Sequence, residues 1–412
     1  MKQCPTPVLL GADLNCYSMA RAFYEGYGVH SYAFGRQRLG ATHASKYIHF
    51  TEVPDLDNAK VLLQTLANFA SRYRKEAPFL LLPTTDDYAY LLIDGQEALS
   101  RQFLMSVPER RFLSYFDKEH FYTACRTYGI PYPETVVLNS PPDIEGAEAL
   151  GRRLGYPFII KPSSSRSYWH HPFPGMEKVY LVHNRHAAHC ALESIFASGY
   201  PHRVLGQRYL AGGDSAATVL TLYLDRSSRV TMRAAGRVLL EEHTPCGKGN
   251  YAALITAPIP PIARRLSAFL EAVGYRGFAN FDLRTDVQTG KTYVLEMNLR
   301  QGRSAHFLTA GGENPAVRLV EDVYLQKTRK CRDMQKQILF RTVPRYVLRR
   351  YTQDEVLLER AERLMQASRD ENPYYHAKDL AANPRRLLYV LAHMARERQK
   401  FRHYVTPSDR RK

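Results

Sequence analysis

The sequence predicts an α/β protein built from two to four packed units. Short apolar runs alternate with helical patterns early in the chain, as in an open and mostly parallel sheet. Between residues 204 and 257, predicted strands dominate instead. The length of 412 residues exceeds what one core usually fills, and 45% hydrophobic with 24% charged residues is typical of a globular chain.

The first predicted elements alternate between strand and helix. Residues 8–11 form a candidate buried strand, a helical pattern follows, and residues 31–34 form a second strand. The apolar run at residues 79–83 predicts another strand, leading into a helix for which Thr85 or Asp86 is a suitable N-cap. The first turn contains a single glycine, so the dinucleotide-binding fingerprint is missing. We therefore interpret this unit as a scaffold with one rim at a functional site.

Prolines and glycines divide the middle of the chain. A boundary is expected near residues 114–117, and Pro131 and Pro133 force extended backbone after the next helix. The later elements are predicted as a helix at 147–154, strands at 158–162, 179–182, 204–210, 217–224, 230–238 and 252–257, a helix at 261–273, and a hairpin with arms at 278–284 and 292–298.

The predicted hairpin carries the strongest chemical pattern. Because side chains alternate along a strand, Asn280 and Asp282 share one face, as do Glu296 and Asn298 on the partner arm. Opposing arms would bring Asp282, Glu296 and Asn298 near one point, and oxygen ligands with free positions left for phosphate suit Mg²⁺. The alternative is an ordinary solvated face of a hairpin whose other face is buried.

Two lysines favour the metal interpretation. Lys161 ends an apolar strand, where its ammonium needs an anionic partner, and Lys118 begins a helix 43 positions earlier. Residues 163–167 follow with hydroxyls and backbone donors suited to closing over phosphate. Isolated lysines are otherwise usually solvated surface residues.

The positive charge is concentrated at the C-terminus. The net charge is +17, and residues 326–412 contain 22 Lys and Arg against 10 Asp and Glu. Such a segment can meet nucleic acid, an anionic membrane face or a polyanionic substrate. The apolar and basic residues at 334–350 suggest either an amphipathic membrane-surface segment or a helix packed on the core with a solvated basic face. The 28 tyrosines are spread over all segments, so we do not expect a nucleic-acid partner.

The cysteines and the N-terminal residues indicate the cellular compartment in which the protein is expected. The six cysteines are scattered without zinc spacing, which favours a reducing environment over a disulfide framework. Neither a signal peptide nor a membrane-spanning run is recognisable. We expect a cytoplasmic protein, with peripheral contact at the inner membrane face as an open alternative.

Five motifs resemble the ATP-grasp superfamily in order and spacing. They are Asp-Lys at 117–118, Ile-Pro-Tyr-Pro at 130–133, Phe-Ile-Ile-Lys-Pro at 158–162, Gln-Arg-Tyr-Leu-Ala-Gly-Gly-Asp at 207–214, and Phe-Asp-Leu at 281–283 with Leu-Glu-Met-Asn-Leu-Arg at 295–300. The resemblance covers roughly residues 5–325. It implies an α/β (α+β) ATP-grasp fold that begins with a Rossmann-like pre-ATP-grasp domain at 1–115. The two-lobed nucleotide-clamping region would follow, with a central subdomain at 116–205 and a C-terminal lobe at 206–325 that contains the metal site. A basic, mainly helical extension would occupy 326–412.

Carried over position by position, this resemblance implies a role for each matching residue. ATP would meet Lys118, Lys161, Ser167, Gln207, Arg208, Tyr209, Leu210 and Asp214, with the two lysines on phosphates, Gln207 at the adenine amino group and Asp214 at the ribose. Asp282, Glu296 and Asn298 would hold one or two Mg²⁺ ions, with Mn²⁺ as an alternative, while Arg300 and Lys161 would act in catalysis and Arg303, Ser304 and Lys248 would contact substrate.

Two stretches narrow the resemblance further. Residues 9–23 and the Asn-Leu-Arg-Gln-Gly-Arg-Ser run at 298–304 are similar to D-aspartate ligases of peptidoglycan cross-bridge synthesis. This implies a ligase that activates D-aspartate as an acyl phosphate and passes it to the lysine amine of an anionic peptidoglycan precursor, releasing ADP and phosphate. The alternatives are a ligase for another amino acid or small carboxylate, or a non-catalytic basic nucleic-acid- or membrane-binding protein on a degenerate ATP-grasp fold.

The phosphate loop departs from the superfamily pattern. That loop is normally rich in glycine, which lets the backbone approach phosphate closely. Here residues 163–169 contain no glycine, and the first one is Gly175. Serine hydroxyls would have to replace some backbone contacts.

Overall fold

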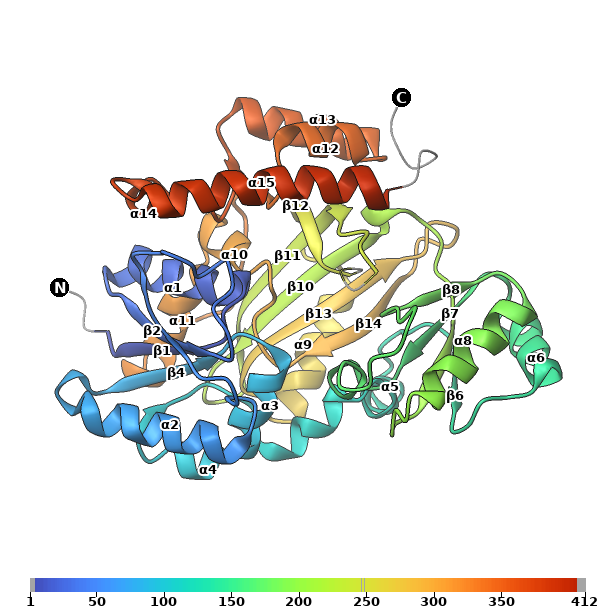
Figure 1. Cartoon of the computed structure of the whole chain (residues 1–412), viewed down its shortest axis with the longest axis horizontal. Helices are drawn as coiled ribbons and strands as arrows, with labels where there is room; N and C mark the ends of the chain where they lie inside the picture. Colours follow the sequence, from blue (N-terminus) through green and yellow to red (C-terminus); the bar gives the residue numbers. More distant parts are fainter. Residues whose placement is uncertain (1–3, 246, 248, 406–412) are drawn as a thin grey trace.

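The α/β fold predicted from the sequence is confirmed by the computed structural model, which describes residues 4–245, 247 and 249–405. The described chain forms three sheets of five, eight and four strands. Figure 1 shows the five-stranded and four-stranded sheets at opposite ends, with the eight-stranded sheet between them.

The N-terminal sheet is parallel, with strand order β3-β2-β1-β4-β5. Alternate residues of its strands enter two cores, since Leu9 and Leu82 pack with helix α1 whereas Val8 and Leu10 pack on the opposite face. Thr85 caps helix α3, as expected, accepting from the Tyr88 amide at 3.4 Å. The elements are β1 (Thr6–Leu10), α1 (Leu14–Tyr27), β2 (Ser31–Gly35), β3 (Ile48–Glu52), α2 (Ala59–Arg72), β4 (Phe79–Pro83), α3 (Asp86–Asp94), α4 (Gln96–Leu99) and β5 (Phe103–Leu104).

The four-stranded sheet is antiparallel, with order β6-β9-β7-β8, and helices α6 and α8 share its apolar core. Part of the serine-rich segment that was expected to be a loop is a short helix, α7, because the Ser164 hydroxyl caps it by accepting from the Ser167 amide at 3.4 Å. The elements are α5 (Lys118–Thr127), β6 (Thr135–Leu138), α6 (Ile144–Leu154), β7 (Phe158–Pro162), α7 (Ser165–Tyr168), β8 (Tyr180–Val182), α8 (Arg185–Ala197) and β9 (Val204–Arg208).

The eight-stranded sheet contains the predicted hairpin. Its path is β14-β13-β10-β11-β12-β16-β17, with β15 paired to β11. The C-terminal segment supplies β15 (Arg332–Asp333), β16 (Leu339–Arg341) and β17 (Asp370–Glu371). Helices α5 and α9 bury their apolar residues against one face, and α1, α10 and α11 cover the other. The elements before the extension are β10 (Ala217–Leu224), β11 (Val230–Glu241), β12 (Tyr251–Ala257), α9 (Ile262–Ala272), β13 (Gly277–Thr285), β14 (Thr292–Asn298), α10 (His306–Ala310) and α11 (Pro315–Leu319).

The C-terminal segment is joined to this sheet. Strand β16 pairs antiparallel with β12, and β17 pairs with β16, so the segment continues the sheet beyond β12. Figure 1 shows helices α12, α13 and α15 together on the β12 side of the molecule. The elements are β15 (Arg332–Asp333), β16 (Leu339–Arg341), α12 (Arg345–Tyr351), α13 (Glu355–Gln366), β17 (Asp370–Glu371), α14 (Ala377–Leu380) and α15 (Pro384–Tyr404).

The structure does not support the membrane-surface interpretation of residues 334–350. Ile338, Leu339, Phe340, Val343 and Val347 are all buried in the protein core. Their burial, with the neighbouring arginines of α12 exposed, matches the alternative of a packed segment with a solvated basic face. Within the described residues, every helix is too short or too polar to cross a bilayer.

Candidate active site

The β13–β14 hairpin brings carboxylates and amides together. Asp282 lies directly opposite Glu296, and Asn280 lies opposite Asn298. Directly opposed residues of an antiparallel pair point to the same face, so these four side chains share one face of the hairpin. The Tyr251 hydroxyl, from β12, donates to Asp282 Oδ1 at 2.8 Å. The three oxygen-bearing side chains expected to gather here are therefore adjacent.

The two predicted lysines lie beside this hairpin. Lys118 Nζ is 3.1 Å from Glu296 Oε1 and donates to the Ser165 hydroxyl at 2.8 Å. Lys161 Nζ donates to the Tyr122 hydroxyl at 3.1 Å. Both lysines are buried, at 5% and 7% exposure. Two cations from separate elements thus approach the carboxylate pair.

Two cavities meet at this point. The larger has a volume of about 810 Å³ and lies between the four-stranded sheet, the hairpin and the C-terminal segment. The smaller, about 160 Å³, lies toward the N-terminal sheet. Asp282 and Glu296 line both cavities, as do Lys178 and Tyr251. The carboxylates are therefore shared between two binding spaces.

Lys178 is a third cation that the sequence patterns did not indicate. It lies just before β8, in a stretch with no special spacing, and its charge acts on Asp282 and Glu296. Its Nζ is 3.3 Å from where a Cβ would stand on Gly249. Lys178 and Gly249 thus lie side by side, and both line the two cavities.

Burial and mutual charge shift the pKa values of this cluster. Burial and then the Glu296 charge raise the pKa of Asp282 from 3.8 to about 6. Burial by itself would raise the pKa of Glu296, but Lys118, Lys178 and Lys161 lower it from 4.5 to about 2. Burial lowers the pKa of Lys161 from 10.5 to about 8. Asp282 therefore carries the less compensated negative charge.

At one end of the larger cavity Gln207 presents an amide oxygen. The Gln207 amide nitrogen donates to the hydroxyls of Tyr122 at 3.1 Å and Thr135 at 2.8 Å. Both its N–H groups are thereby used, which leaves the amide oxygen to accept from an amino group. Arg208, Tyr209 and Leu210 line the cavity next to it, and the Arg208 guanidinium donates to the Tyr293 hydroxyl at 3.0 Å.

The next part of this cavity is acidic. Asp214 Oδ2 accepts from the Glu241 amide at 2.9 Å and lies 3.0 Å from His243 Nε2. Burial and then the Asp214 charge raise the pKa of Glu241 from 4.5 to about 7. Glu241 was not predicted, because it ends an apolar strand without a recognisable motif. These acceptors are of the type that binds sugar hydroxyls.

The smaller cavity contains the predicted arginines. Arg300 lies against Asp86, with Nε 2.8 Å from Oδ1 and Nη2 donating to Oδ2 at 2.9 Å. Arg303 Nη1 donates to Glu242 Oε1 at 2.7 Å. Ser304, which is 5% exposed, lines the same cavity. Two guanidinium groups held in place by carboxylates suit a ligand that carries carboxylates of its own.

Two residues that were expected in the site, Ser167 and Lys248, are not among the described residues that line the cavities. Ser167 is not among the residues that line either cavity in the described chain, whereas Ser165, two positions earlier, lines both. The short helix α7 is the cause, since it turns Ser165 toward Lys118. Lys248, expected to contact substrate, lies outside the described residues.

The donor set at the junction fits Mg²⁺. Asp282, Glu296 and Asn298 offer only oxygen ligands, which a hard cation prefers, and too few of them to enclose it. The raised pKa of Asp282 indicates a negative charge that a divalent cation would compensate.

Solved structures share this fold. A biotin carboxylase domain of Hydrogenobacter thermophilus, bound to MgADP and bicarbonate, matches with a TM-score of 0.60 at 15% identity, covering 80% of this chain and 72% of that one. The N5-carboxyaminoimidazole synthetase of Staphylococcus aureus, complexed with ADP, matches with a TM-score of 0.59 at 15% identity over 82% of both chains. These neighbours are ATP-grasp proteins, and the chain has the ATP-grasp fold.

Sequence relatives define the family. No protein-family model matches the chain. The D-aspartate ligase of Enterococcus faecium is 31% identical over 381 residues, 90% of each protein. A D-alanine–D-alanine ligase of Verminephrobacter eiseniae is 26% identical over 215 residues, 49% of this chain and 59% of that one. The protein is an ATP-dependent, ADP-forming ligase of the ATP-grasp class. Within that class, the chain belongs to the D-aspartate ligase family.

Proposed function

We propose that this ligase activates D-aspartate as an acyl phosphate and transfers it to an amine. The observation that carries the proposal is the carboxylate pair Asp282–Glu296 at the junction of two cavities, with Lys118, Lys161 and Lys178 around it. One cavity suits a nucleotide and the other suits an amino acid with more than one carboxylate. Their junction is where a phosphoryl group would pass between them.

ATP would occupy the larger cavity. The free amide oxygen of Gln207 accepts from the adenine amino group, and Arg208, Tyr209 and Leu210 border the ring. Asp214 and the unpredicted Glu241 lie where ribose hydroxyls would stand. In this pose the phosphates extend toward the lysines at the junction, where the ammonium groups neutralise phosphate charge.

Asp282, Glu296 and Asn298 would hold one or two Mg²⁺ ions. The metal, once bound, supplies charge neutralisation for the phosphate oxygens. The protein side chains do the rest of the electrostatic work, since Lys118 and Lys161 are held at fixed positions by Glu296 and Tyr122. Fixed charges need no reorganisation when negative charge develops in the transition state.

The amino acid would occupy the smaller cavity beside Arg300, Arg303 and Ser304. Its carboxylate oxygen attacks the γ-phosphorus, a new O–P bond forms, and the bond to the bridging oxygen breaks to release ADP. The amine nitrogen then attacks the acyl carbon, phosphate leaves and the nitrogen loses a proton. Arg300 lies near Asp282 and the junction, so it is placed to stabilise the acyl phosphate.

The acceptor would be the lysine side-chain amine of a peptidoglycan stem-peptide precursor. Support for this comes from the similarity to the D-aspartate ligase of Enterococcus faecium and from the positive charge of the chain, which suits a precursor carrying phosphate and carboxylate groups. We propose that the acceptor lies near Gly249, which lines both cavities.

The experiment is a screen of amino-acid-dependent ADP release. D-aspartate, L-aspartate, D-asparagine and D-alanine are compared with purified protein, ATP and Mg²⁺, with and without a muropeptide precursor, and amide formation is followed by mass spectrometry. D-aspartate should give the highest turnover and an aspartyl-lysine product. A higher rate with another amino acid would show that this amino acid, and not D-aspartate, is the substrate. Salt-sensitive RNA binding without turnover would favour a non-catalytic protein.

A further inference from the structure

Among the described residues, the Arg303 side chain makes its hydrogen bond and ion pair with Glu242. Its Nη1 donates to Glu242 Oε1 at 2.7 Å, and the Asp13 carboxylate acts on the guanidinium through its charge. Nε and Nη2 are thereby left for a ligand in the smaller cavity, which Arg303 lines. The Glu242 side chain is only 10% exposed, against 36% for Arg303. Glu242 therefore lies in the protein wall behind Arg303, whereas Arg303 faces the ligand space of the smaller cavity.

Helix α15 packs behind Glu242. A crevice of about 10 Å³, too small for a ligand, separates Glu242 and His243 from Glu397, Lys400 and Phe401 of α15. Glu397 is 2% exposed and accepts from Lys400 Nζ at 2.7 Å. The His243 and Phe401 rings lie 6.3 Å apart. The helix thus limits the space into which Glu242 can move.

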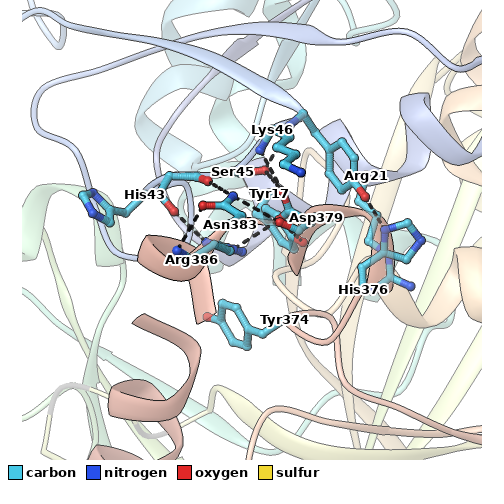
Figure 2. A network of polar contacts seen from close by, with 12 residues as sticks. Tyr17, Arg21, His43, Ser45, Lys46, Tyr374, His376, Asp379, Asn383 and Arg386 are labelled. Carbon is cyan, nitrogen blue, oxygen red and sulfur yellow. Dashed lines mark hydrogen bonds and ion pairs between the residues drawn. The ribbon is translucent and has the colours of Figure 1, made fainter. Parts of the chain in front are cut away.

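The other end of α15 is held by the loop between β2 and β3 and by helix α1 (Figure 2). Arg386 is fully buried, with Nε 3.2 Å from Asp379 Oδ2 and Nη1 donating to the carbonyls of Ala41 at 2.8 Å and His43 at 3.0 Å. The Tyr17 hydroxyl of α1 donates to the same Asp379 at 2.9 Å. Because α15 spans from this network to Glu242, the segment is a fixed support rather than a free tail.

We propose that Glu242, supported by α15, is a positioning residue that aims Arg303 at the second carboxylate of a dicarboxylic amino acid. The inference rests on the proposed function and adds a basis for selecting aspartate over a monocarboxylic amino acid. A guanidinium is planar and binds a carboxylate well only in a fixed orientation. The Glu242 contact supplies that orientation through one nitrogen and leaves the others for substrate.

The test replaces Glu242 with glutamine and compares two substrates. In E242Q the KM for D-aspartate should rise on the order of tenfold, because the hydrogen bond from Arg303 loses its charged acceptor and holds the guanidinium less firmly. The KM for ATP and the turnover with D-alanine, which lacks the second carboxylate, should stay near wild type. E242D keeps the charge and should recover part of the preference for D-aspartate. An equal loss for both amino acids in E242Q, or no loss, would overturn the inference.

Two further variants separate positioning from general stability. Glu362→Gln removes an arginine partner on α13, where Arg349 Nε lies 2.6 Å from Glu362 Oε1, away from both cavities. Glu362→Gln should leave the preference for D-aspartate over D-alanine unchanged. If this variant lost as much of that preference as E242Q does, the result would contradict the inference. Glu397→Gln should raise the KM for D-aspartate less than E242Q does. An unchanged KM in this variant would show that α15 does not support Glu242. If the wild type turns over no amino acid, the proposed function itself fails, whatever the variants do.

Discussion

Replacing Glu296 with glutamine tests the junction of the two cavities most directly. The change keeps the size of the side chain but removes one negative charge next to Lys118, whose Nζ is 3.1 Å from Oε1. Asp282 is then the remaining carboxylate of the opposed pair. Because Glu296 also raises the pKa of Asp282, the remaining carboxylate should become more acidic in the variant.

The magnitude follows from the position of Glu296. Loss of one preorganised charge at a phosphoryl-transfer site typically slows turnover about a hundredfold or more. The fall in pKa from 4.5 to about 2 corresponds to at most about 3 kcal/mol of stability, and 24% exposure of the side chain reduces this to about 1–2 kcal/mol. A lowered carboxyl pKa stabilises the fold above the unfolded pKa, so the whole contribution is present at pH 7 and is lost as pH falls toward 2.

The assay measures ADP release with saturating D-aspartate across a Mg²⁺ titration, alongside thermal unfolding at pH 7. We expect turnover of Glu296→Gln to fall at least a hundredfold at every Mg²⁺ concentration, with cooperative unfolding retained. Glu362→Gln is the matched control, because that carboxyl also has a lowered pKa and an arginine partner at 2.6 Å. Near-normal turnover in Glu296→Gln would refute the metal and phosphate assignment.

Three other outcomes are expected. Burial lowers the pKa of Lys161 to about 8, so kcat/KM for ATP should fall as pH rises through 8, and K161R should shift that limb upward in a pH–rate profile. Tyr251→Phe removes a hydrogen bond that lowers the pKa of Asp282, so the half-saturating Mg²⁺ concentration at pH 6.5 should rise severalfold in ADP-release titrations. Arg386→Met leaves Asp379 buried without its cation and should cost about 3–5 kcal/mol in denaturant unfolding.

The hairpin was predictable because its information is local. Alternation along each arm, with a turn between them, sets which residues share a face, and the observed register pairs Asp282 with Glu296 as the pattern requires. Lys118 and Lys161 were found because their neighbours mark a helix start and a buried strand. Each of these signals lies within about ten residues of sequence.

The unpredicted site residues depend on long-range packing. Lys178, Tyr251 and Glu241 come from three separate segments of the chain, and their positions near Asp282 follow from how the sheets pack rather than from any local spacing. The serine segment differs from the expected loop for a local reason, since the cap at Ser164 forms a short helix and Ser165 rather than Ser167 lines both cavities.

Strand β12 has a consequence for any shortened version of the protein. Its residues Ala253, Leu254 and Ile255 pair with β16, and six of its seven residues are buried. A chain ending before β16 would leave these backbone groups unpaired beside exposed apolar side chains. Such a bare edge invites strand addition from another molecule, and a truncated enzyme should form aggregates on expression unless another segment replaces that cover.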